Sequence, residues 1–254
     1  MYKDIETETS YKYLKIVISS LKEPICILGG WAVFFTVNES YKRQMARVYI
    51  GSRDIDIGFN SIASFNRAAS ILEKKLNFKF VSFRYYKNIN ADTGKDLSDE
   101  EASSMPQHLY FQIYVDPIMH YADSKLKSAL GFMPIDEPLL KYAFEGKKYG
   151  KYVKEFGKNL LLPAPEILLA AKICSAILRD KEHKRHKDIC DITALCLFAG
   201  MPIDDIIKAG KIFVPKDKLK KFSRMDFADD AKNCSNALGL ESSIVKSVID
   251  KVKG

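Results

Sequence analysis

Cysteine and histidine are scarce in this sequence, and the pattern of the few that occur argues against two classes of protein. The five cysteines are odd in number, contain no Cys-x-x-Cys pair and fall mainly in apolar helical contexts, where cysteine is usually a small buried hydrophobe. His183, His186 and Cys190 are close in sequence, but lysine and arginine surround them and oppose cation binding. We therefore expect neither a disulfide framework nor a zinc site, and we expect a reducing, cytoplasmic setting.

Long uninterrupted apolar runs are also missing. The most apolar stretch, LLLPAPEILLAAKICSAIL, is broken by two prolines, by Glu166 and by Lys172, so we expect no membrane span. The first ten residues, MYKDIETETS, contain no apolar core, and we expect no signal peptide there. The sequence therefore gives no reason to expect a membrane partner.

Positively charged residues outnumber negatively charged ones. The formal net charge is +8 and the pI is about 9.0, which permits an anionic partner such as a nucleotide or a nucleic acid. A lysine-rich solvated surface explains the same excess equally well. The 254 residues are enough to bury a sizeable core as one large or two smaller domains.

The distribution of apolar residues changes along the chain. Helical spacing predicts helices over residues 10–23 and 61–76 and another beginning at WAVFFTV, and connections are expected over residues 38–47 and 90–106. Apolar, aromatic and β-branched runs predict strands at residues 25–28, 53–59, 78–86, 109–118, 139–144 and 159–163. From residue 165 onward the pattern is helical to the end. The sequence thus predicts an α+β protein: a small mixed sheet with flanking helices over residues 1–162 and an all-helical domain over 163–254.

Acidic residues interrupt one of the predicted strands. In GSRDIDIGF, alternation along a strand sends Asp54 and Asp56 to one face and Ile55 and Ile57 to the other. The same alternation in FQIYVDPI places Asp116 on the face opposite its buried apolar residues. We therefore expect three carboxylates on one face of a single sheet.

Three neighbouring carboxylates repel one another, and a divalent cation removes that conflict. Carboxylate oxygens suit Mg²⁺, which typically takes a few carboxylates together with substrate phosphates. Two such ions, roughly 3.5–4 Å apart, can serve an in-line phosphoryl displacement. The alternative is a half-exposed strand whose aspartates simply face water.

Two adjacent glycines lie upstream of the aspartates. Gly29 and Gly30 follow the predicted strand at residues 25–28 and precede a helix. Glycine lets the backbone approach a phosphate closely, and a helix N-terminus offers N–H groups to an anion. An ordinary strand-to-helix turn is the alternative for this pair.

Taken together, GGWAV, SRDIDI and YVDPI resemble the DNA polymerase beta-like nucleotidyltransferase superfamily. The resemblance implies an α+β nucleotidyltransferase core in which Asp54, Asp56 and Asp116 bind two Mg²⁺ ions, and in which the third aspartate also helps to activate the acceptor hydroxyl. Asp123 is the alternative for this third position. The nucleotide-binding positions that the resemblance implies are Gly29, Gly30, Ser52 and Arg53.

A second motif lies in the C-terminal half. The segment PAPEILLAAKICSAILRDKEHKRHKDICDITAL looks like a helix pair of AbiEii-type and related minimal nucleotidyltransferases. The match implies that Lys172 and Arg179, which are seven residues apart on one helical face, reach the triphosphate of the nucleotide. The alternative is that they pair with Asp188 or Asp191 and lock two helices together.

These resemblances imply a Mg²⁺-dependent enzyme that transfers a nucleoside monophosphate from an NTP to an acceptor hydroxyl and releases pyrophosphate. The acceptor could be RNA, a protein or a small molecule, and an AbiEii-like toxin would also have an antitoxin-like partner protein. The alternatives are an antibiotic-modifying adenylyltransferase and a non-catalytic nucleotide- or RNA-binding module on the same fold.

Overall fold

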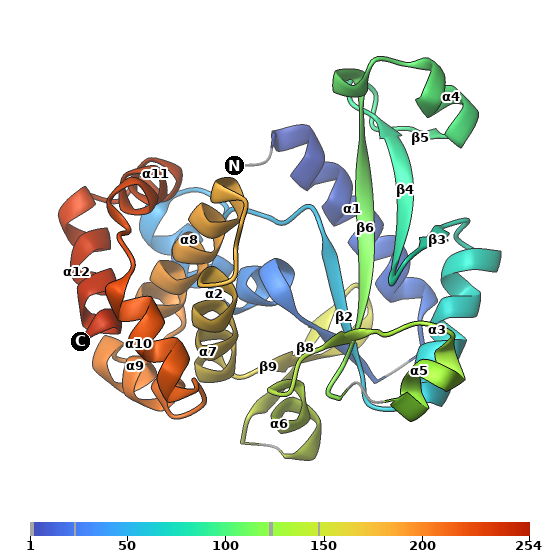
Figure 1. Cartoon of the computed structure of the whole chain (residues 1–254). Coiled ribbons are helices and arrows are strands. Elements are labelled where there is room, and N and C mark those ends of the chain that lie inside the picture. Colours follow the sequence, from blue (N-terminus) through green and yellow to red (C-terminus); the bar gives the residue numbers. More distant parts are fainter. Residues whose placement is uncertain (1–2, 23, 122–123, 147) are drawn as a thin grey trace. The chain divides into compact units, whose positions relative to one another are not determined.

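The computed structural model describes residues 3–22, 24–121, 124–146 and 148–254, and its contacts divide the chain into two compact units (Figure 1). The sheet unit comprises Tyr2–Trp31 and Gly51–Pro163, and the helical unit comprises Ala32–Ile50 and Ala164–Gly254. The architecture confirms the predicted α+β class with a helical C-terminal half, and the predicted boundary after residue 162 stays a prediction.

A mixed β-sheet forms the framework of the sheet unit. Its strands lie in the order β3-β4-β6-β2-β1-β9-β8, with β5 paired to β4 and β7 paired to β6. The pairs β1–β9, β2–β6 and β6–β7 are parallel, and the other pairs are antiparallel. The strands are β1 (Ile25–Ile27), β2 (Ile55–Phe59), β3 (Lys79–Val81), β4 (Arg84–Asn90), β5 (Asp96–Leu97), β6 (Tyr110–Met119), β7 (Ile135–Asp136), β8 (Gly150–Glu155) and β9 (Lys158–Pro163).

Alternation along β6 separates two faces of this sheet. Phe111, Ile113 and Val115 are buried, whereas Gln112 and Tyr114 between them are half-buried. We call the side that carries Gln112 and Tyr114 the polar face. The described helices of the sheet unit are α1 (Asp4–Ser20), α3 (Ile62–Lys74), α4 (Asp99–Ser104), η1 (Gln107–Leu109), α5 (Ser124–Leu130) and α6 (Leu140–Glu145).

Both predicted helices of the sheet unit are present, although α1 begins at Asp4, before the predicted start at residue 10. Helix α1 contacts β6, and α3 contacts β2 and β3. Helix α3 begins after Ser61, whose hydroxyl accepts a hydrogen bond from the Ser64 N–H, and it buries Phe65, Ala68 and Leu72 at helical spacing. Burial of such apolar faces is the main favourable term in the folding of this unit.

Two segments predicted as connections are helical, and both corrections have a local cause. Helix α2 (Gly29–Met45) covers residues 38–45 of the predicted connection because Tyr41 extends the buried face four residues after Val37. Residues 90–106 contain β5 and α4 rather than a loop. Helix α4 is fixed by a capping box in which the Ser98 hydroxyl accepts from the Glu101 N–H and the Glu101 carboxylate accepts from the Ser98 N–H.

Two strand predictions also need correction. Residues 140–144 of the predicted strand at 139–144 fall in helix α6, whose buried Leu140 and Ala143 are three residues apart, as in a helix and not in a strand. Residues 78–86 form two antiparallel strands, β3 and β4, because the chain turns at Ser82, which has a positive φ of 57°. The predicted strand at residues 159–163 is confirmed as β9, the second strand of a hairpin with β8.

The helical unit is built around α7 and α8. Helix α7 packs against α8 and α9, and α8 also packs against α11 and α12. Their shared core includes Ile173, Ile189, Ile192 and Leu195, all fully buried. None of the helices in the described ranges combines the length and the apolar character needed to cross a bilayer. The helices are the Ala32–Met45 part of α2, α7 (Pro165–Ala176), α8 (Glu182–Phe198), α9 (Ile203–Lys211), α10 (Lys216–Arg224), α11 (Ala228–Leu238) and α12 (Ser242–Lys253).

Candidate active site

Two of the predicted metal ligands lie directly opposite each other on neighbouring strands. β2 and β6 are parallel, and their register pairs Asp56 with Asp116. Residues paired in this way send their side chains to the same face of a sheet. Asp54 lies two residues before Asp56, just ahead of β2. We refer to Asp54, Asp56 and Asp116 as the carboxylate cluster.

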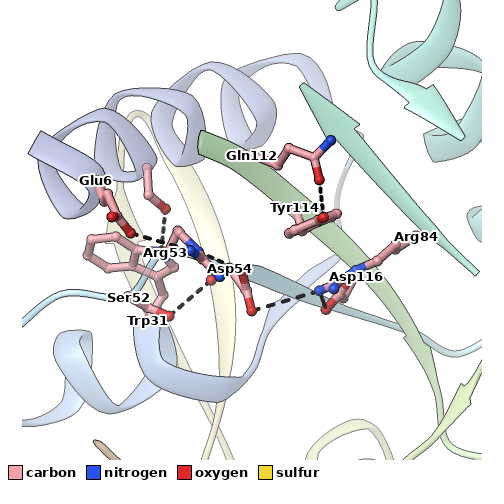
Figure 2. Close-up of polar contacts among 10 residues, drawn as sticks. Glu6, Trp31, Ser52, Arg53, Asp54, Arg84, Gln112, Tyr114 and Asp116 are labelled. Atoms are coloured by element: carbon pink, nitrogen blue, oxygen red, sulfur yellow. Dashed lines mark hydrogen bonds and ion pairs between the residues drawn. The ribbon is translucent and has the colours of Figure 1, made fainter. Parts of the chain in front are cut away.

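A guanidinium group lies between two members of the carboxylate cluster. Arg84, at the start of β4, donates from Nε and Nη2 to the two carboxylate oxygens of Asp116 over 2.7 and 2.5 Å. Its Nη2 is also 3.8 Å from Oδ2 of Asp54 (Figure 2). The guanidinium carbon lies 3.7 Å from the centre of the Tyr114 ring, so the charge stacks on an aromatic side chain of the polar face.

These contacts change the proton affinity of the arginine. Burial on its own lowers the pKa of Arg84, because desolvation disfavours the charged form. The hydrogen bonds that Arg84 donates to Asp116 and the negative charges of Asp116 and Asp54 outweigh this effect, and the pKa of Arg84 is raised overall. Arg84 is therefore a permanent cation beside the carboxylate cluster.

The residues just before β2 make polar contacts of their own. Arg53 reaches Glu6 on α1 from Nη1 at 3.4 Å and Asp54 Oδ1 from Nε at 3.6 Å. The hydroxyl of Ser52, a buried residue, donates to the main-chain carbonyl of Asp54 over 3.1 Å. Figure 2 shows Ser52 and Arg53 on one side of Asp54, with Arg84 and Asp116 on the other. Their roles in nucleotide binding stay predictions.

The first glycine of α2 is required by its surroundings. Gly29 has a φ of +59°, and a Cβ built on it would lie 1.7 Å from Oδ2 of Asp56. The preceding N–H, from Leu28, donates to the carbonyl of Asp56 over 3.0 Å. Gly29 and Gly30 thus open a 17-residue helix whose N-terminal end lies against Asp56. The first N–H groups of a helix have no acceptor within it and favour anions.

The structure places Lys172 in a different setting, within the helical unit. Its Nζ lies 2.8 Å from Oδ1 of Asp188 and 2.6 Å from Oδ2 of Asp191. Arg179 Nε lies 2.7 Å from Oδ2 of Asp188, and Lys187 Nζ lies 2.5 Å from Oδ1 of Asp191. We call Lys172, Arg179, Lys187, Asp188 and Asp191 the helical charge network.

Two neutral side chains complete this network. The Tyr49 hydroxyl donates to Oδ1 of Asp191 over 2.7 Å, and the Ser175 hydroxyl donates to Oδ2 of Asp188 over 2.9 Å. Both aspartates are almost entirely buried. The helix-locking contacts proposed as an alternative for Lys172 and Arg179 are thus present, and their contact with a triphosphate stays a prediction.

Electrostatics inside the network favours the ionised forms. Burial raises the pKa of Asp188. The charges of Lys172 and Arg179 and the hydrogen bonds that they donate lower the pKa by more than burial raises it, so the net shift is downward. For Lys172, burial lowers the pKa, and Asp188 and Asp191 more than compensate, so the net shift is upward. Burial and the nearby Asp191 charge both raise the pKa of Tyr49, which keeps its hydroxyl a donor.

The donor set of the carboxylate cluster fits a hard divalent cation. It offers three carboxylates, and Arg84 demonstrates that a positive group is accommodated between two of them. In their present rotamers, no three His, Cys, Asp or Glu side chains among the described residues are arranged around a common metal position. Asp123, the alternative third aspartate, lies outside the described residues.

Sequence reasoning missed Arg84 and Tyr49. Arg84 is 32 residues from Asp116, and the two meet only through the pairing of β4 with β6. Tyr49 is 142 residues from Asp191. Nothing in the local sequence around either residue indicates such a partner. The one available signal is that Arg84 is a single arginine in an aromatic strand of the sheet predicted to carry the three carboxylates.

Comparisons with known proteins add a limited observation. No family model matches the sequence, and no curated protein matches it. Among solved structures, the chain is similar to an antigenic nucleotidyltransferase-like protein from Paracoccidioides brasiliensis, with a TM-score of 0.42 and 14% identity over 95% of this chain and 96% of that one. At this level of similarity, function has to be argued from the residues of this chain.

Proposed function

We propose that the protein is a Mg²⁺-dependent nucleotidyltransferase, which transfers a nucleoside monophosphate from an NTP to an acceptor hydroxyl and releases pyrophosphate. The observation that carries the proposal is the register of β2 and β6. This register sets Asp56 beside Asp116. Asp56 also follows Asp54 by two residues in the sequence, and its side chain lies against Gly29, the first residue of α2. Carboxylates for a divalent ion and a helix N-terminus for an anion are thereby brought to one place.

In this proposal Asp54, Asp56 and Asp116 hold the metal. Bound Mg²⁺ would neutralise charge on the triphosphate and polarise the phosphorus that is attacked. Asp116 also accepts hydrogen bonds, and a carboxylate there can orient an acceptor hydroxyl and take up its proton. The backbone N–H groups at Gly29 and Gly30 would hold phosphate oxygens, assisted by the Ser52 hydroxyl and by Arg53.

The helical charge network has a secondary place in the proposal. Three cations, Lys172, Arg179 and Lys187, face two buried aspartates, so the network carries a positive excess by the contacts described above. Arg179 is the most exposed of the three, with 35% of its side chain accessible. It is therefore the cation of the network most accessible to an anion in solution, and its contact with a nucleotide phosphate stays a prediction.

The identity of the acceptor rests on the sequence resemblance alone. An AbiEii-like enzyme with an RNA or protein acceptor and an antitoxin-like partner is the first candidate. A small-molecule acceptor, as in antibiotic-modifying adenylyltransferases, is the second. These candidates are separated by the acceptor that becomes labelled.

The test is incubation of the protein with each α-³²P-labelled NTP, Mg²⁺ and, in separate reactions, total RNA, a protein extract and a panel of aminoglycosides and lincosamides. The proposal expects label in one class of acceptor, dependent on Mg²⁺ and absent from an Asp56→Asn protein. A protein that binds Mg²⁺–NTP tightly but labels none of these acceptors would instead be a nucleotide-binding module.

A further inference from the structure

The guanidinium of Arg84 occupies the position between Asp54 and Asp116. Its two hydrogen bonds to Asp116 form a parallel fork, the strongest geometry for an arginine–carboxylate pair. Only 21% of the arginine side chain is accessible, and the Tyr114 ring covers one side of it. The contact is therefore a built feature of the sheet and not a surface pair.

The Arg84 guanidinium and a bound metal ion would compete for the carboxylate oxygens of Asp116. A carboxylate that receives two N–H groups from one guanidinium has fewer lone pairs to offer a metal, and the two positive charges would repel at contact distance. Asp116 is both the partner of Arg84 and the cross-strand neighbour of Asp56. A metal bound by Asp56 and Asp116 would therefore meet the guanidinium.

Charge counting indicates when the exchange is favourable. Of the three aspartates, Asp54 contacts both Arg53 and Arg84, and Asp116 contacts Arg84, so these five side chains carry more negative than positive charge before any ligand arrives. Divalent ions alone would reverse that sign beside a fixed arginine, which is costly in a partly buried site. A triphosphate arriving with the metal restores the balance, and its oxygens match the guanidinium fork as well as a carboxylate does.

We propose that Arg84 is the resident counter-ion of the carboxylate cluster, that a metal–triphosphate displaces it from Asp116, and that its guanidinium then binds the triphosphate. The inference rests on the proposed function. Its consequence is coupling: the metal binds well only together with the triphosphate, so the cluster stays closed by Arg84 until a complete substrate arrives. Coupling of this kind is reciprocal, so each ligand strengthens the binding of the other.

The experiment is a titration of the folded full-length chain with Mn²⁺, followed by the electron paramagnetic resonance of the unbound ion. It is done without and with inorganic tripolyphosphate, a probe that carries the triphosphate charge and no base. Wild type is compared with Arg84→Met and with Arg67→Met, a control on α3 that removes an exposed arginine. An Arg84→Met/Asp56→Asn double variant tests whether the ion occupies the carboxylate cluster.

The inference expects Arg84→Met to bind Mn²⁺ alone about tenfold more tightly than wild type, the scale of one charge-assisted hydrogen bond. Tripolyphosphate should tighten Mn²⁺ binding strongly in wild type and in Arg67→Met, and much less in Arg84→Met. The Arg84→Met/Asp56→Asn double variant should lose the gain in Mn²⁺ affinity that Arg84→Met shows. Equal or weaker Mn²⁺ binding by Arg84→Met would overturn the inference and leave the proposed function standing.

Two further outcomes are distinguishable. If neither wild type nor Arg84→Met binds Mn²⁺ under any condition, the metal site and the proposed function both fail. If Arg84→Met does not fold, the nuclear magnetic resonance of the arginine Nε–H groups in wild type decides. The Arg84 signal should shift when Mg²⁺ and tripolyphosphate are added together, and an unchanged signal at saturation would overturn the displacement.

Discussion

The two units of this protein each contain a group of aspartates surrounded by cations, and the groups differ in burial and in charge balance. In the helical charge network, Asp188 and Asp191 are almost inaccessible, and lysine, arginine, tyrosine and serine side chains meet their oxygens at 2.5–2.9 Å. In the carboxylate cluster, one aspartate, Asp116, is held closely by Arg84, whereas Asp54 is 3.6 Å or more from its arginine partners. The aspartates there outnumber the arginines.

This difference separates carboxylates that hold a fold together from carboxylates that can hold a ligand. A buried pair with several close partners is costly to break and gains nothing from an added cation. A group of carboxylates with a negative excess, next to a helix N-terminus, gains from one. The helical charge network and the carboxylate cluster should therefore respond differently to the loss of one charge.

The largest effect is expected from Asp56→Asn. Removing a proposed metal ligand should lower transfer by more than the roughly 10–100-fold that loss of an outer-shell partner costs. The thermal midpoint should stay within a few degrees, because one charge is removed from a repulsive cluster. Asp99→Asn is the control, since Asp99 lies in the same unit but pairs with Lys79 at the surface. Full activity of Asp56→Asn would remove the carboxylate cluster from the proposed chemistry.

Lys172→Met should act in the opposite way, on stability. It leaves two buried aspartates short of a cation and should lower the free energy of unfolding by about 3–5 kcal/mol. Lys251→Met is the matched control, because Lys251 pairs with Asp204 over 2.8 Å, as Lys172 does with Asp188, but at the surface. That control should cost under about 1 kcal/mol. Denaturant unfolding measures both, and equal losses would contradict the contrast in burial.

Gly29→Ala should affect both stability and transfer. The new Cβ meets Asp56, and the left-handed backbone disfavours alanine, so we expect a loss of about 1–3 kcal/mol in the free energy of unfolding. Gly131→Ala is the control, because Gly131 also has a positive φ, of 78°, but has nothing within 4 Å of an added Cβ. The difference between the two variants isolates the contact with Asp56. If they lose equal stability and Gly29→Ala keeps full activity, that contact has no role.

Part of the loss of stability in acid should trace to Asp188. Its pKa is lowered in the folded chain, so its contribution is complete above the unfolded value and is lost as the pH falls toward the folded value. In that acidic window the wild type should lose about 1.4 kcal/mol per pH unit from this group. Asp188→Asn should be less stable at pH 7 and should show a shallower acid slope. Asp204→Asn, at the surface, should keep the wild-type slope, and an unchanged slope in Asp188→Asn would refute the assignment.

Much of the sheet unit follows from sequence because its determinants are local. Alternation around Asp54 and Asp56, and again before Asp116, depends only on neighbouring residues, and so does the glycine turn at the start of α2. The capping box at Ser98 was equally local, and reading it would have identified α4 in place of a loop. Helix α6 has only six residues, which is too short for periodicity to distinguish it from a strand.

The parts that sequence did not predict depend on contacts between distant segments. The position of Arg84 follows from the pairing of β4 with β6, and that of Tyr49 from the packing of its segment onto α8. For Lys172 the sequence left two partners open, a phosphate or an aspartate. Helical spacing identified the face on which it lies, and only the packing of α7 on α8 brings it to Asp188 and Asp191.

The central claim is that the carboxylate cluster is the metal–nucleotide site. The most direct test is a crystal grown with Mn²⁺ and an NTP analogue that carries a methylene bridge between the α- and β-phosphates, examined by anomalous scattering. The account predicts a Mn²⁺ peak coordinated by Asp54 and Asp56, with the triphosphate near Gly29 and Gly30. Bound nucleotide with no ion at these aspartates, or Mn²⁺ bound only elsewhere in the chain, would contradict it.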